Sequence, residues 1–158
     1  MKLVLIVIGK TQKGYLSEAV IDFSDRIKHS MPLEIVEIPA IKKSQKIASK
    51  NEILQTEELA IMKHIRDNDY LIILDERGKS FRSVEFADFL QKVFLIGNKR
   101  MVFVIGGAWG IGGSLKKRAN VQLSLSKMTF SHQLVRLIFL EQLYRALTIL
   151  RNEPYHNE

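Results

Sequence analysis

Hydrophobic and polar residues follow two patterns along the chain, one typical of buried strands and one typical of helices. Residues 2–9, KLVLIVIG, are almost continuously apolar, as expected for a strand buried on both faces of a sheet. Residues 70–76 and 101–107 repeat this pattern, whereas residues 33–40 alternate and indicate a strand nearer an edge. Between the strands, apolar residues recur three and four positions apart, which predicts helices with one buried face.

Local signals mark where several of these elements begin and end. Ser49 and Glu52 have the spacing of a capping box, and Ser131 is placed to cap the last helix. The residues RGK at 77–79 indicate a turn after the third strand. We expect strands at residues 2–9, 33–40, 70–76, 101–107 and 121–130, and helices at residues 15–28, 50–65, 83–95, 114–119 and 131–150.

The regular succession of strand and helix predicts an α/β fold: a mostly parallel sheet of about five strands with helices on both faces. In such sheets, ligands bind outside the carboxyl ends of the strands. Three unusual loops follow strands here: LDERGKS at 74–80, GGAWGIGG at 106–113 and LSLSKMTFSH at 123–132. We therefore expect the functional site where these three loops meet.

The last helix carries apolar residues around most of its circumference. A sheet can bury only one side of such a helix, which favours a second subunit on the other side and thus a homodimer. The alternative is the central helix of a monomer. The residues concerned are Leu134, Val135, Leu137, Ile138, Phe139, Leu140, Leu143, Tyr144, Leu147, Ile149 and Leu150.

Composition narrows the class of protein. A chain of 158 residues, 46% of them hydrophobic, suits one domain spanning residues 1–158. No apolar stretch reaches the roughly 18 residues of a membrane span, and no cleavable signal peptide is recognisable, so we expect a cytoplasmic protein. The absence of cysteine excludes disulfides and a thiolate nucleophile. The spacing of histidines and carboxylates suggests no metal site.

The positive charge of the chain is concentrated in its second half. Residues 1–88 hold 14 basic and 14 acidic side chains, whereas residues 89–158 hold 10 basic and 3 acidic ones, which accounts for the net charge of +7. Such an excess either serves solubility alone or indicates a polyanionic partner such as nucleic acid.

The glycine-rich loop does not match either common phosphate-binding motif. Gly107 and Gly112 have Walker A spacing, but Gly113 stands where the lysine is required. Gly110 and Gly112 begin a dinucleotide fingerprint, but Leu115 replaces its third glycine. The loop therefore indicates either a tight turn or a backbone that closely approaches a bulky ligand or another segment, with an aromatic surface from its tryptophan.

Four stretches of the chain resemble a known bacterial family: MKLVLIVIGK, LDERGKSFRSVEFA, FVIGGAWGIGGSLKKRA and LSLSKMTFSHQLVRLIFLEQLYRALTILRNEPYH. They are similar to the ribosomal RNA large-subunit methyltransferase H family, of the SPOUT class. The resemblance implies methyl transfer from S-adenosyl-L-methionine to N3 of a pseudouridine in 23S rRNA, on assembled ribosomes. It also implies a homodimer and a C-terminal trefoil knot, which general packing rules would not suggest.

Carried over by position, the cofactor contacts of the family lie in the three loops that were chosen from the strand ends. Gly106, with its neighbour Gly107, would let the backbone approach the adenosine and methionine parts, and apolar side chains would form the walls for adenine. The other residues of this set are Leu74, Leu125, Ser126, Lys127, Met128, Thr129 and Phe130.

Four residues are candidates for the chemistry itself. His132 directly follows the cofactor segment and could act as a base, or it could bond locally at the start of the helix. Arg136, one turn on, could meet phosphate or the flipped base. In the tail, Tyr155 offers stacking and His156 offers a base or a hydrogen-bond donor, in the site of this subunit or of its partner.

Lys116, Lys117 and Arg118, just after the glycine loop, are candidates for contact with rRNA phosphates. A second basic run comprises Lys42, Lys43, Lys46 and Lys50. Two other functions stay open: a SPOUT methyltransferase for another RNA position, such as a ribose 2′-hydroxyl or a tRNA base, and a non-catalytic ribosome-associated RNA-binding protein.

Overall fold

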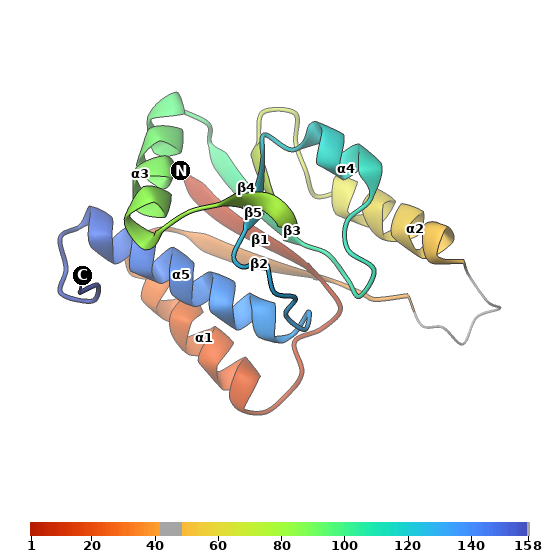
Figure 1. Ribbon diagram of the computed structural model, residues 1–158, viewed down its shortest axis with the longest axis horizontal. Helices are drawn as coiled ribbons and strands as arrows, with labels where there is room; N and C mark the ends of the chain where they lie inside the picture. Colours follow the sequence, from red (N-terminus) through yellow and green to blue (C-terminus); the bar gives the residue numbers. More distant parts are fainter. Residues whose placement is uncertain (42–48, 158) are drawn as a thin grey trace.

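The computed structural model describes residues 1–41 and 49–157. Five strands alternate with five helices along this part of the chain (Figure 1), and eight of the ten elements lie within three residues of the expected ends. The strands are β1 (Lys2–Ile8), β2 (Leu33–Ile38), β3 (Tyr70–Ser80), β4 (Arg100–Ile105) and β5 (Val121–Ser124). The helices are α1 (Tyr15–Lys28), α2 (Lys50–Met62), α3 (Ser83–Ile96), α4 (Gly113–Arg118) and α5 (Leu134–Leu150).

The strands form one parallel sheet in the order β2-β1-β4-β3-β5. β1 and β4, each with a strand on both sides and helices over both faces, are buried along almost their whole length. β2 lies at one edge and alternates between buried and exposed positions. The predicted α/β fold with a parallel sheet is therefore confirmed, as is the edge position of the second strand.

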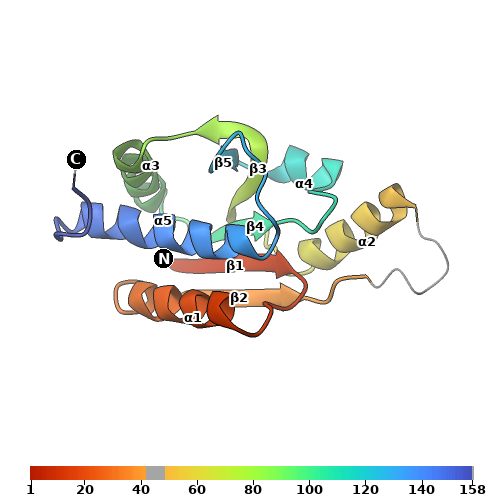
Figure 2. The same cartoon turned by 60° about the horizontal axis from the view of Figure 1, so that its bottom comes forward.

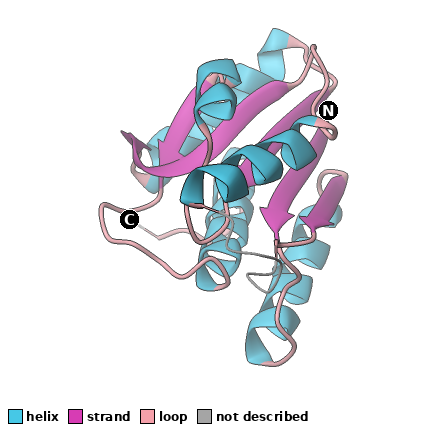
Figure 3. Cartoon of the chain, turned by 90° about the vertical axis from the view of Figure 1, so that its right-hand side faces the viewer, coloured by secondary structure: helices cyan, strands magenta, loops and turns pink. Residues whose placement is uncertain are grey.

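Helices cover both faces of the sheet (Figures 2 and 3). Leu3, Leu5 and other alternate residues of β1 belong to the core under α1, α3 and α5. Val4 and Ile6 point to the opposite face, under α2 and α4. Successive residues of a strand point to opposite faces, so a strand buried on both sides must be apolar throughout, which is the pattern of residues 2–9.

The end of the third strand differs from the expected turn at residues 77–79. β3 continues to Ser80, and its pairing with β5 shifts between Leu74 and Lys79. Gly78 lies in this bulge, where an added Cβ would stand 2.5 Å from the carbonyl oxygen of Gln122. Only glycine fits such a close approach of two backbones, so RGK forms a bulge rather than a turn. β5 is correspondingly shorter than expected and ends at Ser124.

Helix α5 is covered on three sides within one chain. It packs against α1 on one flank, α3 on the other and the sheet beneath, which buries seven of its side chains. The apolar circumference that suggested a second subunit is thus largely accounted for by the chain itself, as in the alternative of a central helix. The homodimer and the trefoil knot stay predictions.

Among the described helices, none is long and apolar enough to cross a bilayer.

Three lysines of the second basic run, Lys42, Lys43 and Lys46, lie outside the described residues, whereas Lys50 opens α2.

Candidate active site

The three loops expected to meet do line one cavity, of about 770 Å³, at the carboxyl ends of β3, β4 and β5. A cavity of this size can hold a small organic ligand, because ligand sites commonly measure about 300–1,000 Å³. α2 contributes Lys50 and Leu54 to the wall, and α4 contributes Lys116. The site is therefore built by the ends of strands β3, β4 and β5 together with residues of helices α2 and α4.

The glycine loop begins with a tight turn. The amide of Gly110 donates to the carbonyl oxygen of Gly107 (3.0 Å), and Gly110 has φ +85°, which an L side chain rarely adopts. An added Cβ on Gly106 would stand only 2.3 Å from the carbonyl oxygen of Gly110. These glycines let the loop fold back on itself, so the turn and the close approach of two segments explain them together.

A different contact explains Gly112. The amide of Leu115 donates to Glu58 Oε1 (2.7 Å), and this carboxylate of α2 caps the start of α4. An added Cβ on Gly112 would stand 2.6 Å from the same oxygen. The second part of the loop is therefore shaped by helix α2 rather than by a ligand.

The loop after β5 is tied to β3 by side-chain hydrogen bonds. Thr129 Oγ1 donates to Glu76 Oε2 (2.9 Å), and Ser124 Oγ lies 3.1 Å from the carbonyl oxygen of Glu76 and 3.0 Å from that of Ser126. Ser126 Oγ in turn accepts from the amide of Met128 (2.9 Å). These side-chain hydrogen bonds hold the loop in place as one wall of the cavity, although the loop has no regular secondary structure.

A charged pair lies in the cavity wall. Lys116 Nζ contacts Asp75 Oδ2 at 2.5 Å, and the side chain of Asp75 is 10% exposed. Burial alone would raise the pKa of Asp75, but the Lys116 ammonium and the amide of Arg77 outweigh it and hold the pKa below its usual range. The carboxylate therefore stays ionised and holds the ammonium of Lys116 at the cavity.

Eight of the nine residues expected to contact the cofactor line this cavity; Lys127 does not. His132 lines it as well. Sequence reasoning selected the loop at 74–80 but missed Asp75 and Glu76 within it. Their position directly after a buried strand was the available signal.

Arg136 does not lie where sequence reasoning expected it. Its side chain is 2% exposed, and its guanidinium donates to the carbonyl oxygens of Ile8 (2.6 Å) and His132 (3.0 Å) and to Thr11 Oγ1 (3.0 Å). Contact with phosphate or a flipped base is therefore wrong for this residue in the described structure. Residues four apart share a helix face, but periodicity could not say that this face turns toward β1.

The tail lies away from the cavity of its own chain. The Tyr155 hydroxyl donates to Glu141 Oε1 (3.1 Å), and His156 Nδ1 lies 3.4 Å from a guanidinium nitrogen of Arg145. Arg145 is about 16 Å along the axis of α5 from the end next to the cavity, by the helical rise per residue. Figure 1 shows the C-terminus at that far end. Tyr155 and His156 are thus not brought to this cavity by their own subunit.

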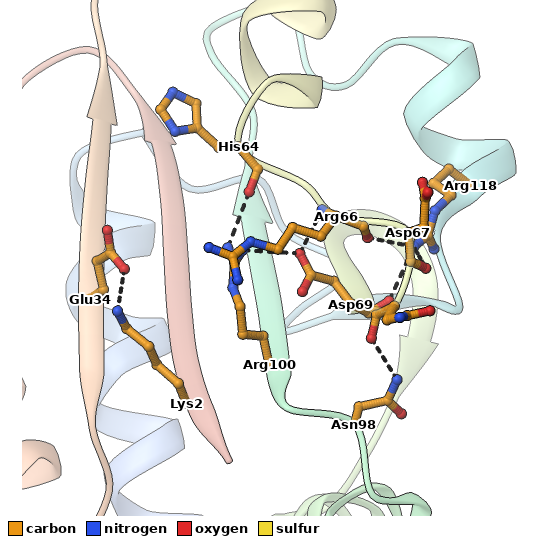
Figure 4. A network of polar contacts seen from close by, with 10 residues as sticks. Lys2, Glu34, His64, Arg66, Asp67, Asp69, Asn98, Arg100 and Arg118 are labelled. Atoms are coloured by element: carbon orange, nitrogen blue, oxygen red, sulfur yellow. Dashed lines mark hydrogen bonds and ion pairs between the residues drawn. The ribbon is translucent and has the colours of Figure 1, made fainter.

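The basic cluster after the glycine loop divides into three environments. Lys116 is paired in the cavity, and Lys117 is exposed. Arg118 donates to the carbonyl oxygens of three residues between α2 and β3, namely Arg66, Asp67 and Asp69. In Figure 4 it belongs to a network with Arg100 and Asn98 that fastens the segment leading into β3. Arg118 is thus held by these carbonyl oxygens, and its contact with RNA phosphate stays a prediction.

The described residues hold no group of three or more histidine, aspartate, glutamate or cysteine side chains that could bind a metal ion. The expectation of a metal-free site stays a prediction.

The fold and the cavity define an α/β protein with a small-ligand site at the carboxyl edge of a parallel sheet. A family model described as "Predicted SPOUT methyltransferase" matches residues 1–156. The chain therefore belongs to the SPOUT methyltransferase family.

Named relatives match this chain over its whole length. The chain is 48% identical to the ribosomal RNA large subunit methyltransferase H of Parabacteroides distasonis, over all 158 residues of both chains. It is 45% identical to the protein of the same name in Christiangramia forsetii, over 99% of each chain. A solved structure of a probable methylase family protein from Haemophilus influenzae covers 99% of this chain and 70% of its own length, with a TM-score of 0.52 and 14% identity, and is similar in fold.

Proposed function

We propose that this chain transfers a methyl group from S-adenosyl-L-methionine to N3 of a pseudouridine in 23S rRNA, on assembled ribosomes in the cytoplasm. The observation that carries the proposal is the convergence of the three strand-end loops on one cavity. Eight of the nine residues expected to contact the cofactor lie in its wall. The names of the full-length relatives support an RNA of the large ribosomal subunit as the substrate.

The residues of the cavity fit the proposed cofactor. Leu74, Leu125 and Phe130 provide apolar surface, and the backbone of the glycine turn provides polar groups close to it. Apolar walls with a few fixed polar groups are the usual form of a site for a ligand with a flat heterocycle. When bound, S-adenosylmethionine would supply a methyl group on a sulfonium: a nucleophile in line with the carbon–sulfur bond would take the methyl, and S-adenosylhomocysteine would leave.

The chain must then bind the acceptor base and help it lose a proton. N3 of pseudouridine carries a weakly acidic imide proton between two carbonyls, and it attacks the methyl carbon once that proton is removed. His132 lines the cavity and is the candidate to take the proton. Lys116, held by Asp75, can stabilise the negative charge that develops on the base.

The positions of Tyr155 and His156 support a second subunit in this proposal. Both are remote from the cavity of their own chain but half-buried against α5, and the tail is ordered there by Glu141 and Arg145. In a homodimer, the tail of one subunit can serve the cavity of the other. The ordered tail, rather than the apolar circumference of α5, is the argument for the dimer.

Calorimetric titration with S-adenosylmethionine, followed by mass spectrometry of rRNA from a deletion strain, tests the function. We expect binding in the micromolar range and the loss of one methyl from a pseudouridine of 23S rRNA. No binding at high micromolar cofactor would favour a non-catalytic RNA-binding protein. Loss of a methyl from a ribose or from tRNA would move the chain to another substrate within the same family.

A further inference from the structure

One aromatic side chain at the cavity has no part in the function proposed so far. Trp109 occupies the tip of the turn between Gly107 and Gly110, lines the cavity and is 44% exposed. Large apolar side chains are normally buried, and a tryptophan left half-exposed at a cavity mouth marks a contact surface for a ligand or partner.

The backbone that carries this tryptophan is held in a closed turn. The turn is closed by the hydrogen bond from Gly110 to Gly107, and Gly106 lies too close to Gly110 for any side chain to be accommodated. A side chain presented by such a turn loses little backbone entropy when it binds, which favours its use as a fixed platform.

A cation lies beside the indole ring. Lys50 Nζ is 5.7 Å from the ring centroid, within the range of a cation–π contact, and it also lines the cavity. The Ser49 capping box fixes the first turn of α2, and with it the backbone of Lys50. Met128, which is 76% exposed, and the exposed Arg77 also line the cavity, so an apolar and a basic group border the same cavity as Trp109.

An exposed ring with neighbouring cations has the chemistry of a stacking platform for single-stranded nucleic acid. Aromatic side chains stack on base faces, and lysine or arginine neutralises the adjoining phosphates. A base that is methylated on its pairing edge must leave the base stack to enter a pocket, which exposes the face of its neighbour. Trp109 stands at the rim, outside the residues assigned to the cofactor, where such a neighbour would lie.

We propose that Trp109, with Lys50, forms a subsite that stacks an unpaired nucleobase of the RNA substrate next to the base that is methylated. The inference rests on the proposed function. It adds a subsite that holds the RNA strand at the cavity. It assigns no role in proton or methyl transfer to either residue.

Kinetics with ribosomes from a deletion strain test the subsite. For Trp109→Ala we expect the KM for ribosomes to rise about tenfold, because base stacking is worth roughly that in binding per base. Trp109→Phe, which keeps a ring, is expected to restore most of the loss, and kcat and the Kd for S-adenosylmethionine stay unchanged. Leu95→Ala, at a side chain 82% exposed on α3, is the matched control and leaves all three values unchanged.

Fluorescence provides a direct reading, because Trp109 is the single tryptophan of the chain. A short single-stranded oligouridine at low salt should quench its emission, and Lys50→Ala should weaken that binding and lower its salt dependence. Binding without quenching, or an unchanged KM in Trp109→Ala, overturns the proposal.

Two other results also overturn it. A weaker Kd for S-adenosylmethionine in Trp109→Ala would assign the ring to the cofactor, and a change of oligomeric state would assign it to a subunit interface. Failure of the proposed function is distinguishable from all of these results. It would appear in the wild-type chain as absent binding of S-adenosylmethionine or as methylation at another RNA position. Quenching of Trp109 by RNA depends on neither.

Discussion

The guanidinium of Arg136, on the first turn of α5, donates to the carbonyl oxygen of Ile8 at the end of β1 (2.6 Å). The same group reaches Thr11 and the carbonyl oxygen of His132, so one buried side chain joins strand β1 to the start of the last helix. Since the loop at 125–130 directly precedes that helix, Arg136 positions one wall of the cavity without entering it.

Replacement of Arg136 by methionine should therefore lower stability more than a surface change does. We expect a loss of about 3 kcal/mol in the free energy of unfolding, because buried acceptors lose a charged donor. Urea denaturation measures it. Arg151→Met, which breaks an exposed ion pair with Glu153, is the control and should change stability by less than about 1 kcal/mol. A stable Arg136→Met chain that had lost only activity would contradict this role.

Two glycine substitutions should differ sharply in their effect on cofactor binding. Gly106→Ala places a Cβ 2.3 Å from the carbonyl oxygen of Gly110 and must open the turn, whereas a Cβ on Gly113 meets nothing within 4 Å. We expect Gly106→Ala to weaken binding of S-adenosylmethionine at least tenfold by calorimetry and Gly113→Ala to leave it unchanged. Equal affinities would show that the turn does not shape the site.

Glu57 should make stability depend on pH. This residue of α2 is 7% exposed, and its Oε2 has no hydrogen-bond partner among the described residues. Burial raises its pKa above the ordinary 4.5. As pH rises above 4.5, the unfolded chain ionises this group freely while the folded chain resists, so the free energy of unfolding falls until the pH passes the raised pKa.

Replacement of Glu57 by glutamine removes this fall in the free energy of unfolding at high pH. We expect the variant to gain on the order of 1 kcal/mol over wild type at pH 8 and little at pH 4, in line with the cost of a buried unpaired polar group. Denaturation at both pH values measures the difference, with the exposed Glu18→Gln as control. A gain that is the same at the two pH values would mean that ionisation is not its cause.

The tail can be tested by mixing subunits. If the tail of one subunit serves the cavity of another, then a Gly106→Ala chain and a chain lacking residues 155–158 are each inactive alone. Co-expressed, they form mixed dimers with one intact site, and we expect about a quarter of the wild-type activity, since half the dimers are mixed and each has one site of two. Methyl transfer to ribosomes measures this. No recovery in verified mixed dimers would show that the tail of one subunit does not serve the cavity of the other.

Much of the fold follows from short-range patterns. Residues 3–8 are apolar at every position, and only a strand covered on both faces tolerates that, so the parallel α/β sheet could be predicted. The position of the site followed from the same reasoning, because strand ends in such sheets share an edge. The bulge at Gly78 could not be predicted, since it depends on how closely β3 and β5 approach.

The sequence by itself determined the periodicity, the loops at the strand ends and the family resemblance, because each of these depends on residues near one another in the chain. The partners of the charged side chains were decided only by the tertiary structure. Arg136 and Arg118 look alike in sequence, as basic residues beside the site, yet one is buried against Ile8 and the other binds carbonyls before β3. Which acceptors stand within reach of a long cationic side chain depends on contacts between segments far apart in the chain, and no local pattern contains them.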